Sequence, residues 1–265
     1  MEKVGLEEIK KIQIEILDNV DAFCKKNKIN YWLDCGTLLG AVRHKGYIPW
    51  DDDIDIAMLR KDYDYFFEHF NQIDSKYRVY SVENNALFNY PMAKVLDTST
   101  TLYEPDEKTG MKSSINIDIF VFDNAPDDDN KCNKMIERRD LYSKLRYAQM
   151  FPEAYDHSIL SKRIVRFFLK IYLKILPKNY YTKKVIQNAK KEINTKTKRV
   201  ANFTSATTAV CDRKVFQNFI NMEFEGKKYP VPKDYNTVLT SMYGDYMQLP
   251  PKEKRVTHHK FVAYK

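Results

Sequence analysis

The chain has 265 residues, of which 43% are hydrophobic and 14% aromatic, a composition that provides a full core and argues against extensive disorder. Its four cysteines are far apart and form no CxxC pair, which argues against a structural zinc site and a small disulfide scaffold. The net charge is +8, yet ten of the 44 Lys and Arg residues lie between 159 and 191, where there is no Asp or Glu.

The first expected elements are a long helix and a strand-to-helix turn. Apolar side chains recur along residues 6–28 at the spacing of one helix face, at Ile9, Ile12, Ile16, Val20 and Phe23. A short strand over 31–34 and a second helix over 38–43 follow. Gly36 and Thr37 occupy the turn between them, where close backbone approach and the positive end of a helix favour contact with phosphate.

Two later strands carry acidic residues on one face. Residues 53–58 alternate in polarity, so that Ile54 and Ile56 share one side and Asp53 and Asp55 the other. The segment INIDIFVF alternates in the same way and places Asp118 opposite its isoleucines. Between these strands we expect one helix and two strands, over residues 61–70, 77–82 and 92–95.

The second half of the chain is expected to be mainly helical. Asp127–Asn130 provides an N-cap for a helix that runs to about residue 146, and a further helix is expected over 159–176. A proline-containing, loop-rich tail with a short helix over 235–243 completes the chain. We therefore expect a mixed α/β (α+β) fold, with a catalytic core over 1–128, a helical region over 129–200 and a C-terminal segment over 201–265 that packs back on the core.

The aspartates in these two strands require a chemical explanation, because aspartate is disfavoured in strands. Adjacent carboxylates repel one another unless a cation lies between them, and Mg²⁺ is held by carboxylates together with substrate phosphates. Asp53, Asp55 and Asp118 are therefore predicted to bind Mg²⁺, with Mn²⁺ as an alternative, and to align a phosphoryl group for transfer. The competing interpretation is that both strands are half-exposed and their acids merely solvated.

The motifs around these acids resemble those of a known family. The segment LDCGTLLGAVRHKGYIPWDDDIDIAM, residues 33–58, resembles the signature of the LicD family of phosphorylcholine-transferase-like proteins, which belong to the nucleotidyltransferase-fold superfamily. INIDIFVFD resembles the family's strand with the third acid, and YPVPKDYNTVLTSMYGDYMQLPP, residues 229–251, resembles its closing segment. Thr37 departs from the broader superfamily pattern, which usually has Gly or Ser there.

This resemblance implies transfer of a phospho-alcohol, typically phosphocholine from CDP-choline, to a cell-surface glycan such as teichoic acid or lipopolysaccharide, with release of CMP. It implies that Asp53 and Asp55 hold Mg²⁺ on the diphosphate. Asp118 would share a metal or help to deprotonate the acceptor hydroxyl. Relatives handle other CDP-activated alcohols, including ribitol and glycerol phosphates, so the alcohol stays open.

Other residues are candidates for supporting roles. Arg43 and Lys94 could neutralise phosphate charge, although Arg43 could equally be a surface residue at a helix end. Choline would need aromatic faces, for which Trp50, Tyr47 and Tyr90 are candidates. The possible supporting or acceptor-facing residues are Asp51, Asp52, Trp50, Tyr243 and Asp245.

The helix over 159–176 is basic along one face and apolar elsewhere, with Lys162, Arg166, Lys170 and Lys174 recurring every four residues. This pattern is typical of a helix at an anionic membrane surface, although a core helix with a solvated basic stripe would also show it.

We expect a cytoplasmic protein, peripheral at the inner face of the cell membrane, with a lipid-linked glycan acceptor and no nucleic-acid partner. The alternatives are a true nucleotidyltransferase acting on a small molecule or RNA, and a non-catalytic membrane-associated scaffold.

Overall fold

The computed structural model describes residues 2–103, 113–150, 160–257 and 261–265, and its centre is a mixed sheet. The strands of this sheet run in the order β2 (Trp32–Leu33), β3 (Asp55–Leu59), β7 (Asn116–Ala125), β5 (Ala93–Asp97) and β4 (Tyr77–Tyr80). Strands β3 and β7 are parallel, and the other neighbours are antiparallel. The mixed α/β fold expected from the sequence is confirmed.

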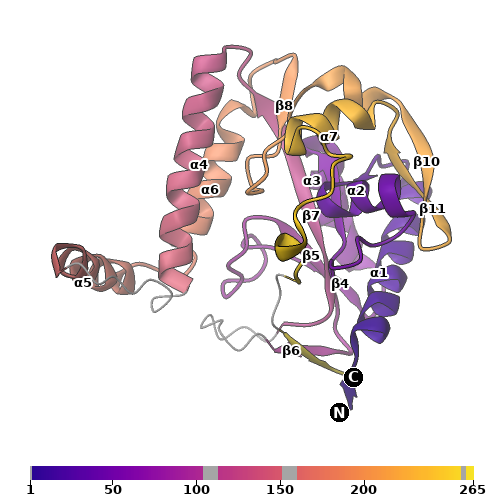
Figure 1. The fold of residues 1–265 in the computed structure, drawn as a ribbon, viewed down its shortest axis with the longest axis horizontal. Coiled ribbons are helices and arrows are strands. Elements are labelled where there is room, and N and C mark those ends of the chain that lie inside the picture. Colours follow the sequence, from indigo (N-terminus) through magenta and orange to yellow (C-terminus); the bar gives the residue numbers. More distant parts are fainter. Residues whose placement is uncertain (1, 104–112, 151–159, 258–260) are drawn as a thin grey trace.

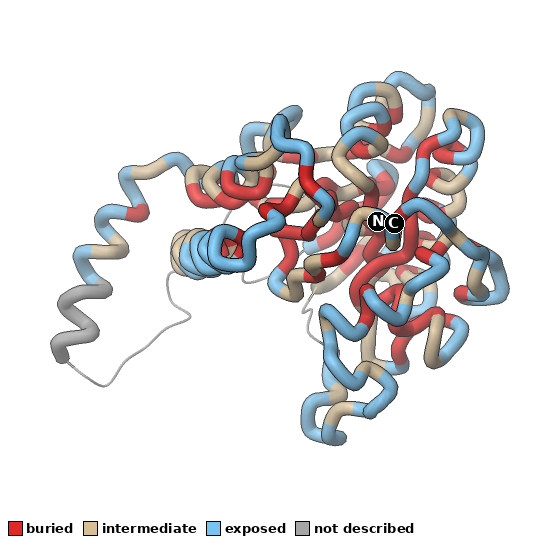
Figure 2. Tube along the Cα trace, turned by 90° about the horizontal axis from the view of Figure 1, so that it is seen from above, coloured by how far each residue is buried: buried red, intermediate tan, exposed pale blue. Residues whose placement is uncertain are grey.

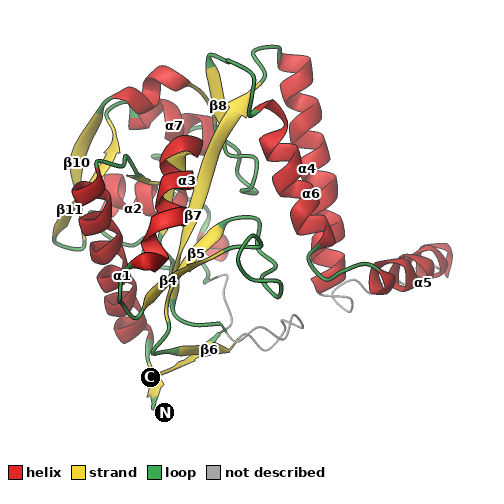
Figure 3. Cartoon of the chain, turned by 180° about the vertical axis from the view of Figure 1, so that it is seen from behind, coloured by secondary structure: helices red, strands yellow, loops and turns green. Residues whose placement is uncertain are grey.

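Three helices position the sheet and the turns at its edge (Figures 1 and 3). Helix α1 (Leu6–Asn27) packs against β5 and β7, and its predicted apolar face is buried. Its first turn carries two acids and its last turn two lysines, which complement the helix dipole. Helix α3 (Arg60–His69) packs against β3 and β7, while α2 (Cys35–His44) packs against β3.

The far end of β7 leads into a helical region. There β7 pairs with β8 (Arg199–Ala201), which pairs with β9 (Val210–Asp212). Helices α4 (Asp129–Met150) and α6 (Tyr180–Ala189) lie side by side near this end, and a small apolar cluster joins them to it. Helix α5 (Leu160–Ile175) projects away from the body of the molecule in Figures 1 and 3. No helix in the described part of the chain is long and apolar enough to cross a membrane.

The C-terminal segment contains more regular structure than the loop-rich tail expected from the sequence. Strands β10 (Phe219–Phe224) and β11 (Lys227–Pro232) form a hairpin. Glu225 and Gly226 both have positive φ at its turn, as a tight two-residue hairpin requires. The prolines at 230 and 232 suggested loop, but a two-stranded ribbon tolerates proline because its outer edge needs no N–H donor.

The C-terminal elements share the main core with the N-terminal half. Buried residues of β9, β10, β11 and α7 (Tyr235–Tyr243) belong to the same apolar cluster as α1 and the central sheet. Figure 2 shows that buried residues are concentrated in the body of the molecule. A second sheet brings the two termini together, in the order β1 (Lys3–Val4), β12 (Val262–Tyr264) and β6 (Thr101–Tyr103). Short 3-10 helices occupy Phe70–Gln72, Lys190–Glu192, Arg213–Gln217 and Lys252–Lys254.

Candidate functional site

The central strands bring the predicted acids to one end of the sheet. In the parallel register of β3 and β7, Asp55 lies directly beside Asp118. The N–H of Asp118 donates to the carbonyl oxygen of Ile54 at 2.8 Å, and this bond continues the pairing toward Asp53. Asp53 itself precedes β3 rather than belonging to it. We call the carboxylates gathered here the acid cluster, which consists of Asp51, Asp52, Asp53, Asp55 and Asp118.

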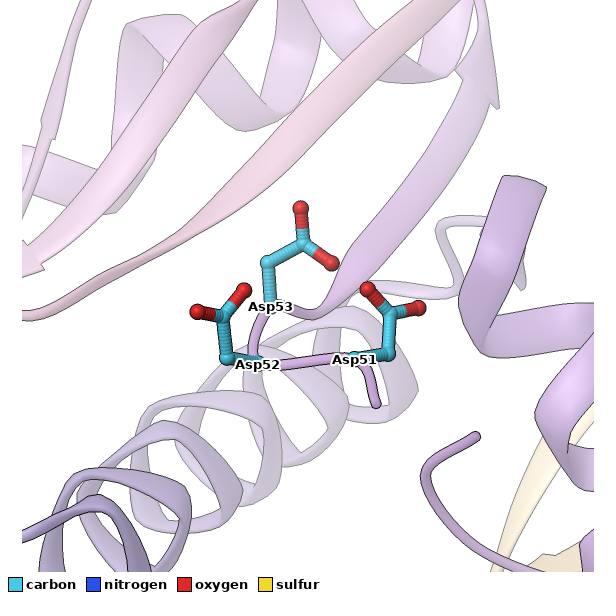
Figure 4. Close-up of side chains that lie close together, drawn as sticks. All are labelled: Asp51, Asp52 and Asp53. Carbon is cyan, nitrogen blue, oxygen red and sulfur yellow. The ribbon is translucent and has the colours of Figure 1, made fainter. Parts of the chain in front are cut away.

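Asp51, Asp52 and Asp53 form the most compact part of the acid cluster. Each offers one carboxylate oxygen that lies within 4.8 Å of those of the other two, and within the described ranges no other three acidic, His or Cys side chains form such a group. Figure 4 shows the three side chains pointing to the same side of the loop. Asp52 is only 4% exposed, so it is not a solvated loop residue. Asp51, Asp52 and Asp53 could therefore hold a metal ion together, whereas the predicted set of Asp53, Asp55 and Asp118 does not form such a compact group.

The carboxylate of Asp55 shows how strongly the negative charge is concentrated. Its pKa is raised well above the ordinary value, first by burial and then by the nearby charges of Asp53 and Asp118. A buried carboxylate surrounded by others is stabilised in its charged form by a cation. This is the arrangement expected of a site for a divalent metal ion.

Lys94 is in direct contact with the third predicted acid. It lies on β5 opposite Asp118, and its Nζ is 2.6 Å from the carboxylate and 3.0 Å from Oδ1 of Asn116. The same ammonium lies over the ring of Tyr90, 4.6 Å from its centroid. The side chains of Lys94 and Asp118 are both largely buried. The predicted phosphate-binding lysine is therefore fixed at the edge of the acid cluster.

The first turn of α2, where the sequence predicted a turn before the helix, holds the acid cluster in place from the other side. A Cβ on Gly36 would lie 2.6 Å from Oδ2 of Asp51. Any residue other than glycine at this position would therefore displace the Asp51 carboxylate. Thr37 is buried, and its Oγ1 accepts a hydrogen bond from the N–H of Asp55 at 2.8 Å. This contact gives Thr37 a role in positioning β3. A contact between its hydroxyl and phosphate stays a prediction.

The remaining candidates lie in a pocket beside the acid cluster. Arg43, Trp50, Tyr243 and Asp245 all line this pocket. Two further lining residues, Tyr246 and Arg255, were missed by the sequence reasoning. Tyr246 is the third residue after Tyr243 in the closing segment, whereas no local pattern distinguishes Arg255 from the other basic residues around it.

Asp34 is a fully buried carboxyl at the start of α2. It is the N-cap residue, its Oδ2 accepts a hydrogen bond from Sγ of Cys35 at 3.7 Å, and its Oδ1 has no partner in the part of the chain that the structure describes. Burial raises its pKa from 3.8 to about 7, although the N–H of Cys35 partly offsets this effect. The native state therefore holds the Asp34 proton more tightly than the unfolded chain does. The contribution of Asp34 to the free energy of unfolding is fully present below about pH 4 and is lost as the pH rises through 7.

We accordingly expect Asp34→Asn to stabilise the metal-free protein, and to do so more strongly at pH 8 than at pH 5. One pKa unit corresponds to about 1.4 kcal/mol, so the gain at pH 8 is about 2–4 kcal/mol. Urea unfolding of both proteins in EDTA at the two pH values measures the difference. An equal gain in the free energy of unfolding at pH 5 and pH 8 would contradict the conclusion that the Asp34 carboxyl holds its proton more tightly in the native state.

Comparisons with known proteins relate the chain to one family. The family model described as "LicD/FKTN/FKRP, nucleotidyltransferase domain" matches residues 28–157, which include the whole acid cluster. The lipopolysaccharide cholinephosphotransferase LicD of Haemophilus influenzae is 32% identical over 272 aligned positions, covering 100% of this chain and 99% of that protein.

Shorter similarities extend to other proteins. An uncharacterized protein of Rickettsia typhi is 38% identical over 76 residues, 28% of this chain and 23% of that protein. The ribitol 5-phosphate transferase FKRP of Homo sapiens is 50% identical over 34 residues, 13% of this chain and 7% of that protein. The full-length similarity and the matching family model together show that the chain belongs to the LicD family.

Proposed function

We propose that this protein transfers phosphocholine, or a related phospho-alcohol, from a CDP-activated donor to a cell-surface glycan and releases CMP. As a LicD-family member it is a transferase of phosphate-containing groups. The observation that carries the proposal is its similarity, over the full length of both chains, to a lipopolysaccharide cholinephosphotransferase. Lipopolysaccharide is the favoured acceptor for this reason, and teichoic acid is the second.

The acid cluster has the donor set that Mg²⁺ prefers. All of its oxygens are carboxylate oxygens, and Asp51, Asp52 and Asp53 would hold the ion with Asp55 close by. Mn²⁺ accepts the same ligands. When bound, the metal would supply positive charge against the donor diphosphate and the departing CMP.

The side chains around the acid cluster would orient and neutralise the reacting groups. Lys94 supplies a fixed positive charge at the edge of the cluster, held by Asp118. In the transfer, the acceptor hydroxyl oxygen forms a bond to the phosphorus of phosphocholine, and the phosphorus–oxygen bond to CMP breaks. The proton of the hydroxyl passes to a carboxylate, for which Asp118 is our candidate. Gly36 and Thr37 keep Asp51 and β3 in position for this geometry.

A donor panel with product analysis tests the reaction class. CDP-choline, CDP-glycerol and CDP-ribitol would each be incubated with the protein, Mg²⁺ and extracted lipid-linked glycan. We expect CMP release from one donor together with transfer of its phospho-alcohol. Release of pyrophosphate with attachment of a nucleotide would instead identify a true nucleotidyltransferase. Metal and donor binding without any turnover would identify a non-catalytic scaffold.

Helix α5 supports a location at an anionic membrane surface. Its apolar side chains Phe167, Phe168, Ile171, Tyr172 and Ile175 are exposed, with Phe168 at 64% and Ile175 at 77%. They share one arc of the helix, whereas the buried Leu173 faces the body of the protein. Lys170 and Lys174 border this arc, which is the arrangement of a helix lying between headgroups and acyl chains. A lipid-linked acceptor would be reached from that position.

We expect the protein to float with vesicles that contain phosphatidylglycerol and not with pure phosphatidylcholine vesicles. The double substitution Phe168→Asp and Ile175→Asp should reduce the bound fraction at least about 5-fold, because charge opposes insertion of the apolar arc. Leu141→Asp on α4 is the matched control, since Leu141 is also exposed but lies on a different helix. Binding that survives the double substitution would exclude α5 as the membrane contact.

A further inference from the structure

A pocket of about 570 Å³ lies beside the acid cluster, a volume within the range of small-molecule sites. Three parts of the chain form its wall. Arg43 comes from α2, Trp50 from the loop before β3, and the third part runs from Tyr243 at the end of α7 into the segment that follows, up to Arg255. These parts are distant in sequence, so the pocket exists only in the folded protein.

The pocket adjoins the acid cluster on two sides. Trp50 lines it and is followed directly by Asp51. Tyr243 also lines it, and the pKa of its hydroxyl is raised by burial and then by Cys35, Asp55 and other nearby groups. The pocket therefore lies close to the acid cluster, although none of the five carboxylates of the cluster lines it.

The charged side chains of the pocket favour an anion. The charged residues that line it are two arginines, Arg43 and Arg255, and one aspartate, Asp245. Nη1 of Arg43 donates to the carbonyl oxygen of Tyr246 at 3.0 Å, but its Nε is buried without a hydrogen-bond partner among the described residues. A buried N–H of this kind is costly unless it is bonded, and phosphate oxygens bond guanidinium groups well.

Of the three aromatic residues considered for choline, Trp50, Tyr47 and Tyr90, only Trp50 lines this pocket. The guanidinium of Arg255 lies 5.5 Å from the ring centroid of Trp50, and its Nε donates to the carbonyl oxygen of Pro250 at 2.8 Å. One face of Trp50 thus already carries a cation, and the ring of Tyr90, which does not line the pocket, carries Lys94. Tyr47, the third aromatic considered for choline, is buried and bonded to Gln13. A quaternary ammonium in this pocket would meet the positive charges of Arg43 and Arg255, which oppose its binding.

We propose that this pocket binds the nucleotide half of the donor, with Arg43 and Arg255 on its phosphate and Trp50 against its base, and that the phospho-alcohol lies outside it. The assignment of the base as cytosine rests on the proposed function. Recognition of a nucleotide phosphate by the two arginines does not. The pocket would therefore fix the position of the leaving group and leave the choice of alcohol to other residues.

Equilibrium binding of CMP, measured by calorimetry in EDTA and without glycan, tests the proposal separately from catalysis. Arg43→Met and Arg255→Met should each weaken CMP binding at least about 10-fold, because each removes a charge-assisted contact to phosphate. Binding of cytidine, which lacks the phosphate, should change less than about 3-fold. Arg138→Met is the matched control, since Arg138 is exposed on α4 and should leave CMP affinity unchanged.

Tryptophan fluorescence gives a second readout. Trp32 is fully buried and Trp50 partly exposed, so quenching by CMP should disappear in Trp50→Phe. An excess of phosphocholine should not displace CMP.

The proposal is overturned if wild-type protein does not bind CMP, if both arginine variants bind it normally, or if phosphocholine competes. If the protein transfers phosphocholine but binds CMP independently of the two arginines, only the assignment of the pocket is refuted. If CMP binding depends on the arginines but no transfer occurs, only the proposed function is refuted.

Discussion

Asp53→Ala should abolish phospho-alcohol transfer while leaving the protein folded. Asp53 belongs to the compact carboxylate group and is the first charge that raises the pKa of Asp55. Its removal would take away a proposed metal ligand, and a metal contribution of several kcal/mol corresponds to a loss of at least about 10³-fold in CMP release. Initial rates with CDP-choline, glycan and saturating Mg²⁺ measure this loss.

The stability of Asp53→Ala separates a catalytic role from a structural one. Because Asp53 repels its neighbours in the metal-free protein, its loss should leave the melting temperature in EDTA unchanged or slightly higher. The stabilisation that Mg²⁺ gives the wild type should also be lost. Asp74→Ala is the control, since Asp74 is an exposed acid and should keep full activity. A variant with normal turnover would exclude Asp53 from the site.

Gly40→Ala should destabilise the protein by about 2–3 kcal/mol, the cost of forcing an extra carbon into a packed region. A Cβ at Gly40 would lie 2.4 Å from the carbonyl oxygen of Gly46 and 3.3 Å from the N–H nitrogen of Ile48. Both are backbone atoms, so the loop that leads to Trp50 and the acid cluster would have to move. That loop is also held by Glu225, which accepts a hydrogen bond from the N–H of Tyr47 at 3.0 Å.

Gly36→Ala is the matched comparison on the same helix. Its added carbon meets the side chain of Asp51 rather than backbone, and a side chain can rotate away. We expect near-normal stability, because alanine favours the helix, but at least about 10-fold lower turnover, because the Asp51 carboxylate is displaced. Chemical unfolding and CMP release measure the two effects. Equal destabilisation by both substitutions would contradict the contacts described here.

Much of the central sheet could be predicted because its strands and helices have regular periods. The alternation around Asp53 and Asp118 gave two strands, and their parallel pairing places Asp55 beside Asp118. The helix and strand boundaries are within a few residues of those expected for α1, α3 and β4. Local pattern was sufficient where each element buries one continuous apolar face.

Other features depend on contacts that no local pattern contains. The hairpin of β10 and β11 was missed because prolines obscured the strand, although Gly226 marked its turn. The burial of Asp52 depends on packing of its loop against α1, where Gln13 donates to the carbonyl oxygen of Asp52 at 3.0 Å. The pocket formed with Arg255 depends on the path of the C-terminal segment, which only the folded chain defines.

The most direct test of the proposed transfer is the mass of the acceptor glycan after reaction. Lipopolysaccharide lacking phosphocholine would be incubated with the protein, CDP-choline and Mg²⁺, and analysed by mass spectrometry beside a CMP assay. We predict a mass gain of one phosphocholine group for each CMP released, and no gain in EDTA. CMP release without any change in the glycan, or addition of a nucleotide in place of phosphocholine, would contradict the proposed transfer.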